Sequence, residues 1–279
     1  MSYSAEISRV NPSCFLFLID QSGSMEDPFG GGESTRKKAD AVADAINKLL
    51  QNLVIKCAKS EGVRDYYQTG VIGYGERVGP AFSGALAGRD MVPISDIAST
   101  PARIEERAKK VDDGAGGLAE QKVKFPIWFD AVAKNGTPMC QALTQAKGIL
   151  SAWIAQHPSS FPPIVINITD GESTDGDPTG VARELTNLAT NDGNVLLFNL
   201  HCSSRGNAAV EYPSTERELP DEFSQLLYSI SSELPSYMRN IAAQEGKNVS
   251  EGARGFVFNA DLVSVIQFLD IGTRPNNLR

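Results

Sequence analysis

The chain has 279 residues, of which 41% are hydrophobic and 22% are charged. This composition supports a substantial buried core and excludes a disordered chain. The net charge is −8, from 26 Lys and Arg against 34 Asp and Glu, which argues against nucleic acid or an anionic membrane as a main partner. The charge fits either a site that attracts cations or an ordinary acidic surface. We expect a single domain over 1–279.

The N-terminal stretch predicts neither a signal peptide nor a membrane span. Residues 1–13 lack a basic start followed by an apolar run, and the first apolar run, 14–19, is stopped by Asp20. Such a run is shorter than a signal-peptide core or a membrane helix. The four cysteines form no CxxC pair, so we expect reduced thiols and a cytoplasmic protein.

In the first part of the chain, short apolar runs alternate with helical patterns. The run CFLFLID at 14–20 is continuous, as expected of a strand buried on both faces. Apolar residues at helical spacing then predict a helix over 35–58, with Lys38 on its polar side. Strands are predicted at 66–75 and at 77–82, and the second belongs at a sheet edge because it contains a proline.

Residues 83–130 are rich in Gly, Pro and Asp and form an insertion between the predicted edge strand and Thr137. One helix is predicted over Pro101–Val111, with Ser99 or Thr100 as its cap. We expect the insertion to lie beside the metal face described below. A hydrophobic group near its end is expected to pack onto the core, with contact to a partner as the alternative: Phe125, Ile127, Trp128 and Phe129.

After Thr137 the alternation becomes regular again. The predicted strands cover 162–170, 194–202 and 254–260. The predicted helices cover 138–156, 178–190, 220–245 with an interruption near Pro235, and 261–269. Repeated strand–helix–strand units imply a mostly parallel sheet with helices on both faces.

Three predicted loops at the strand ends carry hydroxyl and carboxylate side chains. The segment DQSGS at 20–24 follows the first strand directly, TDGE at 169–172 follows another, and Thr137 precedes a helix. In parallel sheets, sites form just beyond the carboxyl ends of the strands. Oxygen donors of this kind suit hard cations such as Mg²⁺. Asp20 or Asp170 alone would more simply be a loop residue that caps a helix. All five residues together predict a metal site: Asp20, Ser22, Ser24, Thr137 and Asp170.

These residues resemble the metal-ion-dependent adhesion site of the von Willebrand factor type A (vWA) domain family. DxSxS after a hydrophobic strand, GTP before a helix and TDG after another strand occur in the family's order, and the likeness extends from Phe15 to about Leu269. The resemblance implies a Rossmann-like α/β fold with a core over about 13–270. Its sheet would have five parallel strands and one antiparallel edge strand.

The same resemblance implies roles for the five residues. Ser22 and Ser24 would ligate the metal directly, while Thr137 and the two aspartates, Asp20 and Asp170, would ligate it directly or through water. The metal would be Mg²⁺, or Mn²⁺ or Ca²⁺, and an acidic residue of a partner protein would complete its shell. Three nearby carboxylates are expected to be surface charges rather than ligands: Glu26, Asp27 and Glu172.

The resemblance implies a protein-binding module without enzymatic activity. The chain is similar to small bacterial intracellular members of the family, which are often encoded beside a protein phosphatase and a kinase, or with tellurite-resistance and stress-response genes. A co-encoded phosphatase or kinase is therefore one candidate partner.

Two other functions stay open: a metal-dependent phosphoryl-transfer enzyme and a scaffold with a purely structural metal. Against the enzyme, Ser22 stands where a second acidic residue is usual, and no lysine follows a later strand. No GxxxxGK[ST] or GxGxxG follows a strand, and no GxSxG is present. Nucleotide binding and serine hydrolysis are therefore disfavoured, and His157 and His201 are expected to be structural.

Overall fold

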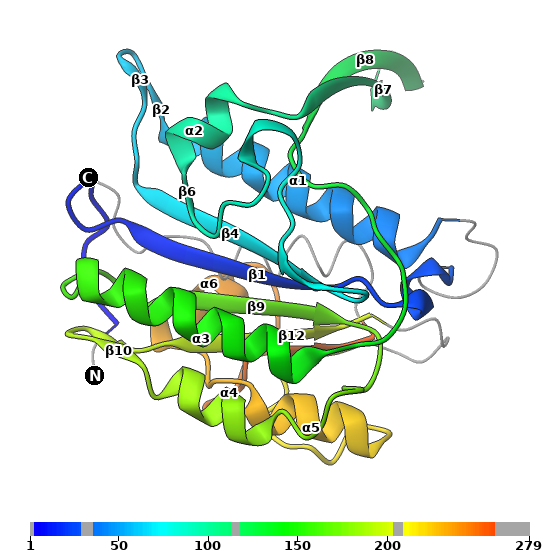
Figure 1. Ribbon diagram of the computed structural model, residues 1–279, viewed down its shortest axis with the longest axis vertical. Helices are drawn as coiled ribbons and strands as arrows, with labels where there is room; N and C mark the ends of the chain where they lie inside the picture. Colours follow the sequence, from blue (N-terminus) through cyan, green and yellow to red (C-terminus); the bar gives the residue numbers. More distant parts are fainter. Residues whose placement is uncertain (1–2, 29–35, 113–117, 203–208, 260–279) are drawn as a thin grey trace.

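The computed structural model describes residues 3–28, 36–112, 118–202 and 209–259. Its centre is an eight-stranded sheet in the order β13-β14-β12-β9-β1-β4-β5, with β6 also paired to β4. Helices cover both faces of this sheet (Figure 1). Among the described residues, no helix is both long and apolar enough to cross a membrane.

The bounds of the elements follow the chain. The sheet strands are β1 (Ser13–Asp20), β4 (Tyr67–Tyr74), β5 (Val78–Pro80), β6 (Val92–Pro93), β9 (Ile164–Thr169), β12 (Leu196–His201), β13 (Val210–Glu211) and β14 (Phe256–Phe258). The helices are α1 (Lys38–Cys57), α2 (Ile94–Ser99), α3 (Met139–Gln156), α4 (Thr179–Thr186), α5 (Glu222–Ile230) and α6 (Ser236–Gln244). The remaining elements are η1 (Gly23–Glu26), η2 (Gly84–Leu86), and the two-stranded pairs β2 (Ala58–Lys59) with β3 (Gly62–Val63), β7 (Arg103–Asp112) with β8 (Leu118–Ile127), and β10 (Ala189–Thr190) with β11 (Gly193–Asn194).

The predicted mostly parallel α/β sheet is confirmed. In the described part of the chain, β14, β12, β9, β1 and β4 pair in parallel. The prediction of one antiparallel strand is wrong, because β5, β6 and β13 all pair antiparallel with their neighbours. The β6 and β13 strands have only two residues each, and their sequences carry no alternation that would reveal a strand. The predicted closing helix at 261–269 lies outside the described residues.

Side chains of β1 alternate between two hydrophobic cores, one on each face of the sheet. Phe15 and Phe17 contact the core that contains α1 and α6, whereas Leu16 and Leu18 contact the core that contains α3, α4 and α5. In Figure 1, α3, α4 and α5 lie in front of the sheet and α6 lies behind it. Burying each large apolar side chain contributes roughly 1.5–3 kcal/mol, so β1 is held from both sides. Its end at Asp20 is therefore a fixed point.

The insertion contains a long two-stranded ribbon instead of the predicted helix at Pro101–Val111. In this ribbon, β7 pairs antiparallel with β8, with Arg103 opposite Ile127. It stands away from the sheet beyond α1 (Figure 1). One contact with α1 is the ion pair between Arg107 and Asp44 (2.7 Å). The capping role predicted for Ser99 and Thr100 is also wrong, because Ser99 ends α2 and Thr100 follows it.

The base of the ribbon packs onto α1, as the sequence predicted for Ile127, Trp128 and Phe129. Phe125, the fourth residue of that prediction, is only partly buried and lies against Arg107 of the ribbon itself. Ile127, Trp128 and Phe129 are each only 2% exposed. The buried Asn47 of α1 accepts hydrogen bonds from the backbone N–H of Trp128 (2.8 Å) and Phe129 (3.1 Å). Its amide also donates to the carbonyl of Phe129 (2.8 Å). One side chain thus satisfies three buried backbone groups and binds the segment that follows β8 to α1.

Candidate metal centre

The first and third predicted loops lie next to each other because β1 and β9 are parallel neighbours. Ile19 is in register with Ile168, so Asp20 and Thr169 end adjacent strands. The carboxylate of Asp20 is buried, with the residue 1% exposed. Its Oδ1 accepts the backbone N–H of Ser22 (2.8 Å), and its Oδ2 accepts the hydroxyl of Thr169 (2.6 Å). Asp20 is therefore oriented by both neighbouring loops.

Burial determines the acidity of this carboxyl group. Loss of solvent raises the pKa of Asp20 to about 6, above its ordinary value of 3.8, and nearby Asp170 adds to the rise. Hydrogen bonds from Ser22 and Thr169 act in the opposite direction without cancelling the effect. A divalent cation close to Asp20 would offset the cost of this buried negative charge.

The two serines of the first loop connect the two aspartates. The hydroxyls of Ser22 and Ser24 lie 3.0 Å apart, and the hydroxyl of Ser24 donates to Oδ1 of Asp170 (2.7 Å). Ser22 is buried, while Ser24 is exposed in η1. The structure thus brings four of the five predicted residues into one run of oxygen atoms across the carboxyl ends of β1 and β9.

Thr137 is brought to the same place by the loop after β9. The backbone N–H of Thr137 donates to the hydroxyl of Thr174 (2.9 Å), and the N–H of Thr174 donates to the carbonyl of Thr137 (2.9 Å). A Cβ atom built on Gly171 would lie 3.8 Å from both the Ser24 and the Thr137 hydroxyl oxygens. Gly171 therefore borders a small space between hydroxyls from two loops.

The first loop is also fixed to the segment that precedes Thr137. The N–H of Lys134 donates to the carbonyl of Gln21 (2.6 Å), and the N–H of Gly23 donates to the carbonyl of Asn135 (2.9 Å). Gly75, just after β4, lies so close that a Cβ atom there would be 2.5 Å from the Gln21 carbonyl oxygen. Close backbone approach of this kind requires glycine. All three predicted loops are therefore joined by hydrogen bonds.

Lys38 belongs to this cluster, although the sequence placed it on the polar side of its helix. It is 3% exposed. Its ammonium donates to Oδ2 of Asp170 (2.7 Å) and lies 3.5 Å from the carbonyl oxygen of Ser24 and 3.7 Å from Oδ2 of Asp27. The signal available in the sequence is its position as the first residue of α1, where the helix dipole disfavours a positive charge unless an anion is near.

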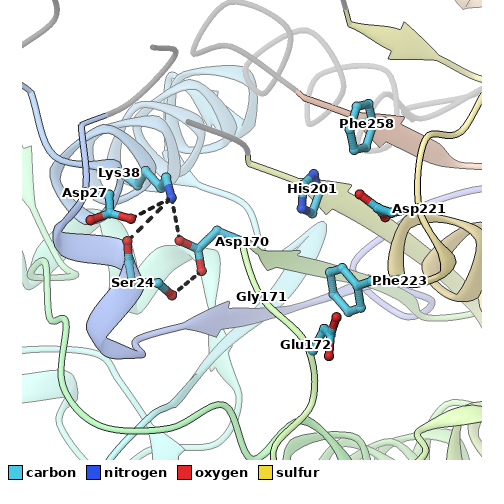
Figure 2. Close-up of a pocket in the computed structure, with 10 residues that line it drawn as sticks. All are labelled: Ser24, Asp27, Lys38, Asp170, Gly171, Glu172, His201, Asp221, Phe223 and Phe258. Carbon is cyan, nitrogen blue, oxygen red and sulfur yellow. Dashed lines mark hydrogen bonds and ion pairs between the residues drawn. The ribbon is translucent and has the colours of Figure 1, made fainter. Parts of the chain in front are cut away.

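A pocket of about 330 Å³ opens beside Asp170. Ser24, Lys38 and Asp170 border it on one side, and aromatic side chains border it across from them (Figure 2). There the rings of His201 and Phe258 are stacked 4.9 Å apart. Three further carboxylates lie at its rim: Asp27, Glu172 and Asp221.

The donor set fits a hard cation better than a zinc-type site. Within the described ranges, no group of three or more His, Cys, Asp or Glu side chains is placed to hold a metal ion. The cluster described above instead offers three hydroxyls and two carboxylates. Mg²⁺ prefers oxygen donors and keeps several waters, so it does not require a cage of carboxylates.

No protein-family model and no curated protein matches the chain. Among solved structures, it is similar to the three N-terminal domains of the type V pilus tip protein Mfa5 from Porphyromonas gingivalis, at 15% identity, with 58% of this chain and 20% of that chain covered and a TM-score of 0.31. The vWF domain of Mfa5 gives 16% identity, covers 59% of this chain and 39% of that chain, and has a TM-score of 0.30.

A further similar structure is an uncharacterized membrane-spanning protein from Vibrio fischeri, at 12% identity, with 68% of this chain and 70% of that chain covered and a TM-score of 0.26. This chain matches less than half the length of either Mfa5 structure. Because these TM-scores are low, the fold described above rests on the chain's own strands and helices.

Proposed function

We propose that this chain is a metal-dependent protein-binding module of the vWA type without enzymatic activity. The observation that carries the proposal is the row of Ser22 and Ser24 hydroxyls between the carboxylates of Asp20 and Asp170 at one end of a parallel sheet. The proposed ion is Mg²⁺, with Mn²⁺ or Ca²⁺ as alternatives, because the donors are all oxygen atoms.

Ser22, Ser24 and Thr137 would hold the ion through their hydroxyls, and Asp20 and Asp170 would hold it directly or through water. The bound ion supplies a Lewis-acidic position at which a carboxylate of a partner protein binds. Both aspartates already accept hydrogen bonds from the protein, so their charge is partly satisfied and the ion keeps an affinity for an outside anion. The proposed partner is a cytoplasmic protein, with a co-encoded phosphatase or kinase as the first candidate.

Calorimetric titration with Mg²⁺ and Mn²⁺ tests the metal part of the proposal. We expect saturable heat for the wild-type chain and none for Asp20→Ala. A matched control is Asp177→Ala, which removes a carboxylate outside the cluster and is expected to bind as the wild type does. Negligible heat for all three proteins would contradict the proposal.

The partner part requires a second experiment, which also separates a binding metal from a structural one. Mn²⁺-dependent capture of the co-encoded phosphatase or kinase should be lost in the double variant Ser22→Ala, Ser24→Ala. Capture that survives in a folded double variant would instead support a scaffold whose metal is only structural.

One observation favours the phosphoryl-transfer alternative more than the sequence did. Lys38 places a positive charge beside Asp170. A phosphoryl-transfer enzyme needs such a charge, and the sequence showed no lysine after a later strand. Against it, both oxygens of Asp20 accept protein hydrogen bonds and the residue is buried, so it is not positioned as a nucleophile. Metal-dependent hydrolysis of p-nitrophenyl phosphate that disappears in Asp20→Ala would decide for the enzyme.

A further inference from the structure

The ion pair between Lys38 and Asp170 is almost completely removed from solvent. The side chains are 4% and 0% exposed, and Nζ lies 2.7 Å from Oδ2. The second oxygen of Asp170, Oδ1, accepts the hydroxyl of Ser24 (2.7 Å). Figure 2 shows the ammonium reaching from α1 to the carboxylate across the edge of the pocket. Both oxygens of this proposed ligand are thus engaged by the protein itself.

A buried carboxylate without a partner is strongly destabilising. In a well-bonded buried ion pair, the attraction between the charges roughly offsets the cost of removing them from water. Lys38 therefore provides Asp170 with a positive charge whether or not a metal ion is bound. We propose that Lys38 is a positioning residue: it holds the Asp170 carboxylate in its place against Ser24 in the metal-free protein, and it lowers the affinity of the site for its divalent ion. This inference rests on the proposed metal function.

The second half of the proposal follows from charge. An ion held by the Ser24 hydroxyl would share Asp170 with the ammonium, and like charges near one another in a poorly solvated site repel. Asp27, which lies 3.7 Å from the ammonium, is 58% exposed and screens this repulsion little. Removing the ammonium therefore strengthens metal binding while weakening the metal-free protein.

Lys38→Met and Lys37→Met form a matched pair of variants. Lys37 is the adjacent residue, and its half-exposed ammonium pairs with Glu26 on the surface, so both variants remove one charge from the same helix end. We expect Lys38→Met to unfold at a lower temperature than the wild type in EDTA and to recover most of that loss in saturating Mn²⁺. Its Mn²⁺ affinity by calorimetry should rise roughly tenfold. Lys37→Met should match the wild type in both measurements.

Asp170→Asn supplies a metal-free readout that simple loss of packing would not produce. Alone, it should lower the unfolding temperature in EDTA, because it leaves the buried Lys38 ammonium with only the exposed carboxylate of Asp27 near it. In the Lys38→Met background it should raise the unfolding temperature, because it removes the unpaired carboxylate. The inference can therefore be tested even if Lys38→Met is too unstable for calorimetry. In that case the double variant Lys38→Met, Asp170→Asn should be folded, and the unfolding temperatures of the two variants can be compared.

Lys38→Arg retains the positive charge and should keep the Mn²⁺ affinity near that of the wild type. If the wild type binds Mn²⁺ and Lys38→Met binds it with equal or weaker affinity, the inference is wrong and the proposed function is unaffected. An Asp170→Asn effect of the same sign in both backgrounds would overturn it as well. Absence of Mn²⁺ binding in the wild type and every variant would instead contradict the proposed function itself.

Discussion

Asp20 is placed where its charge is unfavourable for the stability of the metal-free chain. It lies at the end of a fully buried strand, and burial raises its pKa to about 6. An acid with a higher pKa in the folded state binds its proton more tightly there, so its ionisation reduces stability as pH rises. The reduction begins above the ordinary value of 3.8 and is complete above about 6. Residues that serve binding often carry such a cost.

Asp20→Asn should therefore stabilise the protein when no metal is present. At pH 7.5 in EDTA, we expect the free energy of unfolding to rise by roughly 1–3 kcal/mol, because an isosteric neutral group replaces a buried anion. The gain should shrink as pH falls through 6 and vanish near 3.8. Urea unfolding at several pH values measures it, and a variant less stable than the wild type at pH 7.5 would contradict the expectation.

The sequence predicted the residues of the cluster better than the contacts between them. DxSxS and TDG each follow an apolar run, which is a local signal, and β1 and β9 do pair as neighbours. For Lys38 the sequence offers only its position at the start of a helix, because its burial depends on Asp170, which lies far away in the chain. A lysine in the first turn of an amphipathic helix reads as a surface residue until its partner is known.

At the scale of the elements, α3 begins with a cap that comes from another loop. Oxygens of Asp175 accept the backbone N–H groups of Cys140 (3.0 Å) and Gln141 (2.9 Å). Partial burial alone would raise the pKa of Asp175, but these hydrogen bonds outweigh it and hold the pKa below its ordinary value. The cap joins the loop after β9 to the helix that follows Thr137, so it holds two parts of the proposed site together.

Asp175→Ala should lower both stability and metal affinity. Loss of the cap is expected to reduce the free energy of unfolding by about 1 kcal/mol, and calorimetry should show weaker Mn²⁺ binding because Thr137 is less firmly held. Asp177→Ala is the control, since Asp177 accepts the N–H of Thr179 at the start of α4 instead. It should leave the affinity unchanged.

The pH dependence of this effect has a definite sign. The pKa of Asp175 is lower in the folded state, so its contribution is present above the ordinary value of 3.8 and is lost as pH falls through the folded pKa. The difference between wild type and Asp175→Ala should therefore disappear in acid. A difference that is constant down to pH 3 would show that the carboxylate is not the stabilising group.

The ribbon of β7 and β8 is expected to contribute little to the stability of the rest of the fold. Its contacts with the body include the ion pair between Arg107 and Asp44, and Arg107 lies 3.9 Å from the ring of Phe125 within the ribbon. Each interaction of this type contributes about 1 kcal/mol or less at a partly exposed site.

Replacing 105–125 by an Asn-Gly turn should therefore preserve the fold. Ile104 and Pro126 are opposite one another in the ribbon, so two residues can join them. We expect the free energy of unfolding, measured in urea, to change by less than about 2 kcal/mol and the Mn²⁺ affinity to stay the same. A chain that no longer folds would show that the ribbon supports α1.

The ribbon also shows where local sequence patterns fail. Residues 103–112, RIEERAKKVD, are rich in Arg, Glu and Lys, which favour helix. The chain instead forms a ladder of ten residue pairs with 118–127, and strand formation depends on such cross-strand partners more than on intrinsic preference. By contrast, the break in the helical region 220–245 was predictable, because Pro235 separates α5 from α6.

At the scale of the whole molecule, the two tryptophans report on opposite faces of the sheet. Trp128 belongs to the core with α1, and Trp153 belongs to the core with α3. Both are largely buried, at 2% and 4% exposed. Since β1 contributes side chains to both cores, unfolding of the core on one face of the sheet should destabilise the core on the other face.

We therefore expect a single cooperative unfolding transition, which would support the prediction of one domain. In Trp128→Phe and in Trp153→Phe, the remaining tryptophan's fluorescence and the far-ultraviolet circular dichroism should give the same urea midpoint within each variant. Midpoints that separate in either variant would mean that the two faces unfold independently.

The assembly of the cluster from three distant loops has a consequence for folding kinetics. Asp20, Thr137 and Asp170 meet only after β1 and β9 have paired and the loop after β9 has bonded to Thr137. The proposed ion therefore has no complete site in the early stages of folding. In a chevron plot, added Mn²⁺ should lower the unfolding arm and leave the refolding arm in place, because we expect its interactions to form after the transition state. Metal would prolong the lifetime of the native chain without hastening its formation.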